Sequence, residues 1–274
     1  VGLDNSAGGG GGGSLFGGGR DGFIGLDGGF GTVALGFHGR PWKTSTNNMD
    51  IFGSTIADYS AVMGTTPGGA YFDGGITNAI IWFSPDMNGI KAHVQWGADE
   101  ADNSTNDTGI QVNYTSGPLY GAVSYDVDGQ GTLKDTTALK AAGSYKMGVT
   151  MLSGIFENIS GSDPNSRSAF WFGVAHDMGA LTLKGAFAVA DDSDASGTDD
   201  GATYLAIGLD HKYSDMLKTY VVYSTISNDD GGDYGFVSAP HTSSNGNTAI
   251  STATANRDSS VIAVGFKLDF SFTN

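Results

Sequence analysis

Apolar and polar residues alternate along most of the chain with a period of two. Residues 261–272 show this most clearly, because every even position from Ile262 to Phe272 is apolar, whereas odd positions include Lys267 and Asp269. Neighbouring side chains of a β-strand point to opposite faces of the sheet. The pattern therefore predicts strands with one apolar and one polar face. Three further stretches alternate in the same way, namely 90–97, 181–189 and 204–212.

The alternating stretches predict about 13 strands. Many are about 9–12 residues long, which is the length that a tilted strand needs to cross a bilayer and is longer than the ~5–6 residues typical of soluble sheets. The expected strands lie near 21–28, 31–38, 77–84, 90–97, 109–116, 118–127, 137–146, 149–157, 168–177, 180–190, 202–212, 217–225 and 258–272.

Short and long connections alternate between these strands. The short turns lie near 85–89, 116–118, 146–148, 177–179 and 214–216. The long polar stretches lie near 98–108, 127–136, 158–167, 191–201 and 226–257. Tight turns at one rim and long loops at the other are typical of a transmembrane β-barrel. A soluble β-sandwich also alternates, so that alternative stays open on the pattern alone.

Aromatic residues recur near the predicted strand ends. Because amphipathic rings prefer the headgroup region of a bilayer, transmembrane barrels carry aromatic girdles. Packing in a core is the alternative for each ring taken singly. The rings concerned are Trp82, Phe83, Trp96, Tyr114, Tyr125, Tyr145, Trp171, Tyr223, Phe270 and Phe272.

Composition narrows the class of protein further. The 274 residues include 45 Gly, no Cys and an excess of acid that gives a net charge of −16. Disulfides and cysteine-based metal sites are therefore excluded, and an acidic surface disfavours nucleic acid. The sequence contains no signal peptide and no apolar run near the ~20 residues of a membrane-spanning helix. We expect one all-β domain over residues 1–274.

Several segments resemble the general porins of the β-proteobacterial and neisserial type. The most specific is LFGGGRDGFIGLDGGFGTVALG at 15–36, followed by DIFG at 50–53 and NAIIWFSPDMNGIKAHVQWG at 78–97. Residues 113–125, 145–158 and 264–272 resemble later hairpins and the closing strand of the same barrels. The resemblance implies a transmembrane antiparallel β-barrel of 16 strands that assembles as a homotrimer in the outer membrane. Since about 13 strands are visible, we expect the opening strands to be missing from this sequence.

Residues 39–76 form a long connection with a helical pattern around Asp50 to Met63. The resemblance implies that this loop folds into the lumen and narrows the pore, although an ordinary surface loop is the alternative from sequence alone. Candidate constriction residues on the loop are Asp50, Asp58 and Asp73, and those on the wall are His38, Arg40 and Lys91.

The chain departs from the basic wall of the family, because Phe37 and Ile81 occupy positions where family members carry basic residues. Other cations with lumen-facing parity are Lys140, Lys184, Lys212 and Lys218, each of which is more often a solvated wall residue than a selectivity determinant. With few arginines and an excess of acid, the potential in the pore should be negative and favour cations.

Two of the long loops are rich in acid. Asp99, Glu100 and Asp102 lie in one, and the other holds Asp191, Asp192, Asp194, Asp199 and Asp200. Such clusters supply the oxygen ligands that Ca²⁺ prefers, so a calcium site or a divalent bridge to lipopolysaccharide is one prediction. Solvated acidic loops are the alternative.

No catalytic constellation accompanies the five histidines, since the chain has no GxSxG or HExxH motif. We therefore predict a channel without enzymatic activity or cofactor, through which ions and small hydrophilic solutes diffuse passively. The alternatives are a substrate-selective or mainly structural outer-membrane barrel and a soluble, secreted all-β calcium-binding protein.

Overall fold

A computed structural model describes residues 21–98, 106–129, 133, 135–195, 197–236 and 257–269. Within these residues, 13 strands form one antiparallel sheet in chain order, each paired with its neighbours along the sequence. The strands are β1 (Gly22–Gly28), β2 (Gly31–Gly39), β3 (Gly75–Phe83), β4 (Ile90–Gly97), β5 (Asp107–Ser116), β6 (Leu119–Asp128), β7 (Thr136–Met147), β8 (Thr150–Ser160), β9 (Arg167–Met178), β10 (Leu181–Ala190), β11 (Ala202–Lys212), β12 (Leu217–Asn228) and β13 (Ser259–Leu268).

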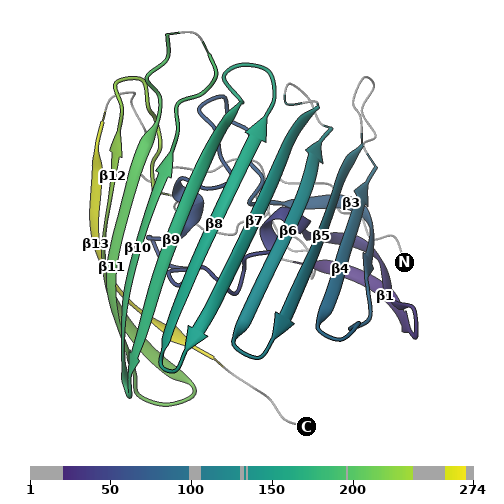
Figure 1. Ribbon diagram of the computed structural model, residues 1–274, viewed down its shortest axis with the longest axis horizontal. Coiled ribbons are helices and arrows are strands. Elements are labelled where there is room, and N and C mark those ends of the chain that lie inside the picture. The colour runs from purple at the N-terminus through teal and green to yellow at the C-terminus, as the bar shows by residue number, and fades with distance from the viewer. Residues whose placement is uncertain are drawn as a thin grey trace, which may run out of the picture.

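The sheet curves strongly, and its strands lie tilted beside one another as in a barrel wall (Figure 1). The described pairings run from β1–β2 to β12–β13, and none of them joins β1 to β13. The predicted all-β fold and its strands are thus confirmed. β8 and β12 continue beyond their predicted ends to Ser160 and Asn228, and the predicted end of the last strand, 270–272, lies outside the described residues.

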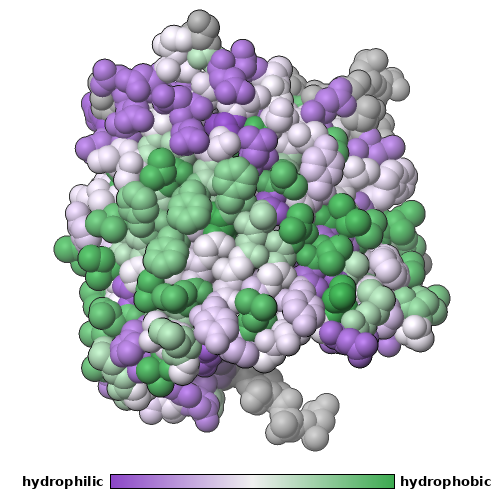
Figure 2. Space-filling model, in the orientation of Figure 1, coloured by the Kyte–Doolittle hydropathy of each residue, from purple (hydrophilic) through white to green (hydrophobic). Residues whose placement is uncertain are grey.

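The alternation of the sequence separates an outer from an inner face. Outward residues such as Ile262 and Val264 on β13 are 73% and 78% exposed, whereas Lys184 and Ala186 on β10 face inward and are buried. Figure 2 shows apolar side chains across the outer face, with hydrophilic side chains gathered on the side of the long loops. A broad band of exposed apolar side chains is stable only where the surroundings of the protein are apolar.

The short turns owe their geometry to glycine. Gly117, Gly148 and Gly179 each begin a two-residue turn, with φ of +55°, +60° and +81°. A glycine with positive φ at the first turn position is typical of the type II′ hairpin, whose twist matches that of the flanking strands. These positions explain why the rim opposite the long loops is so compact.

The aromatic girdle is only partly as predicted. Trp96, Tyr114, Tyr125, Tyr145 and Tyr223 are exposed on the outer face. Two rings point inward instead, because their positions in the strand alternation place them there: the buried Trp171 lies beside Tyr59, and Phe83 lies beside His93 with ring centroids 4.6 Å apart. Trp82 donates its Nε1–H to the carbonyl of Phe30 at 3.0 Å, and Phe270 and Phe272 lie outside the described residues.

Little helix is present. The expected helical segment around Asp50 to Met63 is wrong except for the 3₁₀ turn η1 (Tyr59–Ala61), and a short α1 (Pro41–Thr44) precedes it. Hydrogen bonds of the intervening turns, such as Gly53 N to Asp50 O, satisfy the backbone without a helix. In the part of the chain that the structure describes, no helix is long and apolar enough to span a membrane.

Candidate functional site

The connection between β2 and β3, residues 40–74, lies against the concave face of the sheet and is called the inner segment below. It contains α1 and η1 and lies behind the middle strands in Figure 1. Most of its apolar side chains are buried, and Ile51 and Ile56 are partly buried. They pack against inward-facing residues from β7 to β12, many of them alanines, which leave room for the segment. The buried side chains include Trp42, Met49, Phe52, Tyr59, Val62 and Met63.

Cationic and phenolic side chains of the wall hold the inner segment by its backbone. Lys140 donates to Trp42 O at 2.8 Å, Lys184 to Ile51 O at 3.0 Å, and Lys267 to Gly53 O at 2.6 Å. Tyr120 donates to Ser45 O at 2.6 Å, and Tyr204 donates to Ala57 O. An irregular segment has few backbone partners of its own, and buried carbonyl groups need donors. The wall supplies those donors.

A buried ion pair anchors residues 62–65 of the inner segment. Arg167 on β9 lies 2.7 Å from Glu157 on β8, and both side chains are fully buried. Arg167 also donates to Val62 O at 2.8 Å, while both carboxylate oxygens of Glu157 accept the N–H of Gly64, at 2.9 and 3.0 Å. Each charge therefore has several hydrogen-bond partners, which is what a buried pair needs.

Arg40, predicted as a wall residue of the constriction, is buried in the structure. Its guanidinium is buried and lies 3.3 Å from both Asp107 and Asp128, at the loop-side ends of β5 and β6. Arg40 directly follows β2 and precedes α1, and its side chain reaches the carboxylates of β5 and β6. Arg40 fixes the start of the inner segment.

Two of the three predicted constriction acids are buried in structural contacts. Asp58 precedes η1 and accepts hydrogen bonds from Ser60 N at 3.0 Å and Ser54 N at 3.2 Å. Asp73 lies 3.4 Å from the ammonium of Lys43. Both carboxylates are fully buried. Asp50 alone of the three reaches an open cavity.

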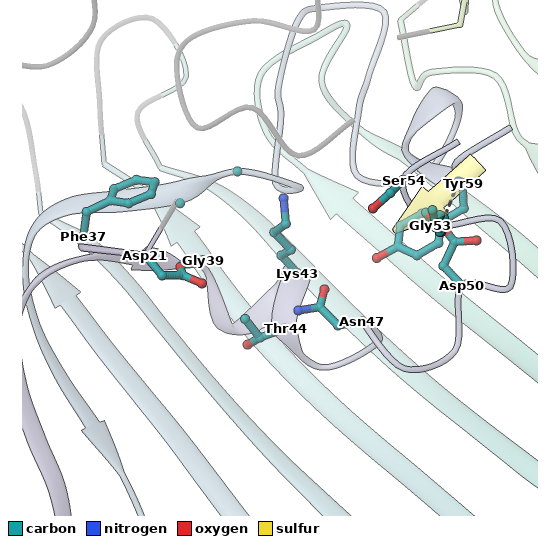
Figure 3. Close-up of a pocket in the computed structure, with 13 residues that line it drawn as sticks. Asp21, Phe37, Gly39, Lys43, Thr44, Asn47, Asp50, Gly53, Ser54 and Tyr59 are labelled. Atoms are coloured by element: carbon teal, nitrogen blue, oxygen red, sulfur yellow. Dashed lines mark hydrogen bonds between the residues drawn. The ribbon is translucent and has the colours of Figure 1, made fainter. Parts of the chain in front are cut away.

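This cavity, called the lumen cavity below, has a volume of about 410 Å³. Figure 3 shows Asp21 and Phe37 on one side, Lys43, Thr44 and Asn47 around α1, and Asp50, Ser54 and Tyr59 on the other side. Lys267 of β13 also lines it. The lining thus mixes carboxylates, ammonium groups, an amide and hydroxyls, which suits hydrated ions and polar solutes.

Burial shifts the ionisation of groups on the inner segment. It raises the pKa of Asp50 well above the ordinary aspartate value, and the neighbouring charge of Asp58 raises it further. Burial and the charge of Asp73 likewise raise the pKa of Tyr59 and of Tyr71. The two tyrosines therefore stay protonated, and Asp50 holds its proton to a higher pH than an exposed aspartate.

The predicted wall residues lie in different places. His38 faces inward beside the rings of Phe83 and His93, at centroid distances of 5.1 Å each. Lys91 lies next to the short turn after β3, 3.6 Å from Asp86, and is more than half exposed. Among the described contacts it has none with the inner segment, because β4 carries it to the rim.

The remaining lysines differ in their carboxylate partners, although Lys212 and Lys218 lie opposite each other on β11 and β12. Lys212 pairs with Asp215 in a short turn at 2.7 Å. Lys184 and Lys218 both pair with Asp210, at 2.7 and 3.0 Å. Reasoning from sequence missed the role of Lys43, Asn47 and Lys267 at the lumen cavity. The sequence signal for Lys267 was its place on the polar face of a strand whose other face is apolar.

The acidic loop after β10 folds so that only some of its carboxylates meet. Oxygens of Asp192, Asp199 and Asp229 lie within 4.8 Å of one another, and all three residues are exposed. Asp229 comes from the loop after β12 and was not predicted. Asp200 is buried and accepts from Ser193 N at 2.6 Å, whereas Asp191 and Asp194 are exposed and outside the group. Of the predicted calcium ligands in this loop, only Asp192 and Asp199 belong to the group, and Asp99, Glu100 and Asp102 lie outside the described residues.

Comparisons with known proteins bear on this arrangement. The family described as Gram-negative porin matches residues 1–231. An anion-selective porin from Comamonas acidovorans is similar at 20% identity and a TM-score of 0.75, over 92% of this chain and 78% of that one. The outer-membrane expressed OmpT of Vibrio cholerae is similar at 14% identity and a TM-score of 0.63, over 91% of this chain and 80% of that one. Its in-vitro folded trimer form is similar at 16% identity and a TM-score of 0.62. A comparison with curated proteins gives no match.

The structural likenesses are all at low identity and show the fold. The family match is independent of them and covers most of the chain. It agrees with an apolar outer face, alternating short turns and long loops, and an inner segment inside a curved antiparallel sheet. The chain therefore belongs to the Gram-negative porin family, and it is an outer-membrane β-barrel of a family of non-enzymatic channels.

Proposed function

We propose that the protein is a passive, water-filled pore that the inner segment narrows and that prefers cations. The observation that carries the proposal is that the wall cations are hydrogen-bonded to the inner segment. Lys140, Lys184 and Arg167 are buried and donate to carbonyl oxygens of the inner segment. A cation that is engaged in this way contributes less attraction for permeant anions than one that faces open water.

The balance of charge inside the sheet points the same way. Away from the rim turns, the inner segment and the concave face carry nine carboxylates and seven cations among the described residues. The carboxylates are those of Asp21, Asp50, Asp58, Asp73, Asp107, Asp126, Asp128, Glu157 and Asp210. The cations are Arg40, Lys43, Lys140, Arg167, Lys184, Lys218 and Lys267. A small excess of negative charge in a narrow aqueous space raises the local concentration of cations.

The Comamonas protein is described as anion-selective. At 20% identity the two chains share a fold, and the charges that line each pore are free to differ. In this chain Phe37 and Ile81 are apolar and buried at inward positions of β2 and β3. These residues give the wall no charge to oppose Asp50.

We further propose that three copies assemble into a trimer, supported by the similarity to the trimer form of the Vibrio protein. The exposed acidic loops would then lie at the outer surface of the assembly. There, Asp192, Asp199 and Asp229 could meet lipopolysaccharide phosphates through a shared divalent cation.

Single-channel recording in planar bilayers tests the pore. Purified protein should insert in steps of three equal conductance levels with linear current–voltage curves. Folding before insertion is checked by the shift in gel mobility between unheated and boiled samples. Folded protein that produces no channels would overturn the proposal.

A further inference from the structure

The carboxylate of Asp50 has no cationic partner at the lumen cavity. Its oxygens accept hydrogen bonds from the backbone N–H groups of Phe52, at 2.9 Å, and Tyr59, at 3.3 Å. No Lys, Arg or His of the described chain lies within ion-pair distance of it. Asp50 is only partly buried, and it is one of the residues that line the cavity (Figure 3).

Lys267 lines the same cavity and is a cation without an acidic partner among the described residues. Its ammonium donates to Gly53 O at 2.6 Å, and no carboxylate of the described residues lies within ion-pair distance. Lys43 and Lys184, by contrast, have Asp73 and Asp210 beside them. An ammonium group has three donor hydrogens, and the Gly53 contact uses one.

The two groups lie close together without touching. Lys267 reaches the carbonyl of Gly53, and Gly53 belongs to the same turn as Asp50, since its N–H donates to Asp50 O at 3.3 Å. Both charged side chains line the lumen cavity, and Asn47 and Ser54 add neutral hydrogen-bonding groups. At about 30 Å³ per water, 410 Å³ holds on the order of a dozen waters, or a small solute with a few waters.

We propose that the lumen cavity is a binding subsite for small zwitterions, namely amino acids and dipeptides, whose ammonium group pairs with Asp50 and whose carboxylate pairs with Lys267. A simple cation or anion satisfies one of these charges and leaves the other without a partner. A zwitterion satisfies both with charge-assisted hydrogen bonds. The inference rests on the proposed pore, because solutes reach the cavity only through it.

The test is a titration of single-channel conductance with glycylglycine, at a pH at which the Asp50 carboxyl is ionised. The matched neutral probe is N-acetylglycinamide, which has a similar size and no charge. Glycylglycine should lower the conductance in a saturable way, whereas the neutral probe should lower it only in proportion to solution viscosity. Acetate and ethylammonium, which each carry half of the charge pattern, should half-saturate at about tenfold higher concentration than glycylglycine.

Two variants assign the residues. Asp50→Asn and Lys267→Met should each raise the half-saturating concentration of glycylglycine by about tenfold or abolish saturation. Lys91→Gln makes a comparable charge change at the rim and should leave the titration as in the wild type. The comparison of probes on wild-type protein needs no variant, so a variant that fails to fold does not remove the test.

The outcomes separate the two proposals. Folded protein without channels contradicts the pore itself. Channels that respond equally to glycylglycine and the neutral probe leave the pore standing and overturn the zwitterion subsite. Saturation that persists unchanged in both Asp50→Asn and Lys267→Met overturns the assignment to these residues.

Discussion

Replacing Arg167 by methionine tests whether the wall holds the inner segment as described. The change removes the 2.7 Å ion pair with Glu157 and the donor to Val62 O, and it leaves the Glu157 carboxylate fully buried. Removing one partner of a buried pair costs about 3–5 kcal/mol. Because Glu157 keeps the N–H of Gly64 at 2.9 and 3.0 Å, we expect the lower end, about 3 kcal/mol.

The free energy of unfolding is measured by urea titration in lipid vesicles, with tryptophan fluorescence as the signal. The double variant Glu157→Gln/Arg167→Met should be more stable than the sum of the single variants predicts, by about 1–2 kcal/mol, since no buried charge remains. Lys91→Met, which breaks an exposed pair with Asp86, should cost less than about 1 kcal/mol. A cost of Arg167→Met as small as that of Lys91→Met would refute the anchoring argument.

Three further predictions concern other parts of the structure. Trp171→Ala should cost about 3–5 kcal/mol in the same unfolding assay, because the ring is fully buried against Tyr59; a cost below that of outward Phe170→Ala would contradict its inward position. Burial and Asp58 raise the pKa of Asp50, so the native state binds this proton more tightly than the unfolded state. The contribution of protonated Asp50 to stability is full below the unfolded pKa and is lost as pH rises through the native pKa. Asp50→Asn should therefore stabilise the protein at pH 8 and change its stability little at pH 3. The opposite ordering would show that the native state favours the carboxylate as an anion. If Asp192, Asp199 and Asp229 bind Ca²⁺, calorimetry should give a dissociation constant of about 0.1–1 mM that Asp229→Asn weakens, whereas wild-type protein without a binding heat would remove the calcium prediction.

The sheet could be predicted from the sequence because its signal is local and repeated. Alternation decides which face of a strand each residue occupies, and Gly148 and Gly179 mark the turns at which the chain reverses. The same rule explains the errors at Trp171 and Phe83. Their position near a strand end indicated the girdle, whereas their parity placed them inside.

The site was harder to predict, because long-range packing decides which charged side chains are buried in contacts within the protein. Asp50, Asp58 and Asp73 are the same residue type on one segment, yet only Asp50 reaches the lumen cavity. Nothing local distinguishes Asp58, which accepts from Ser60 N at 3.0 Å, from an acid that faces water. The partnership of Asp229 with Asp192 and Asp199 joins two loops that are distant in sequence, so no spacing could reveal it.

The reversal potential of the open pore under a KCl gradient tests the central claim most directly. An excess of inner carboxylates and wall cations engaged with the inner segment predict a potential whose sign corresponds to K⁺ crossing more easily than Cl⁻. In Asp50→Asn the potential should move toward zero at a pH above the raised pKa of the Asp50 carboxyl. A wild-type potential of the opposite sign, with Cl⁻ crossing more easily, would contradict the account of the charges while leaving the pore itself intact.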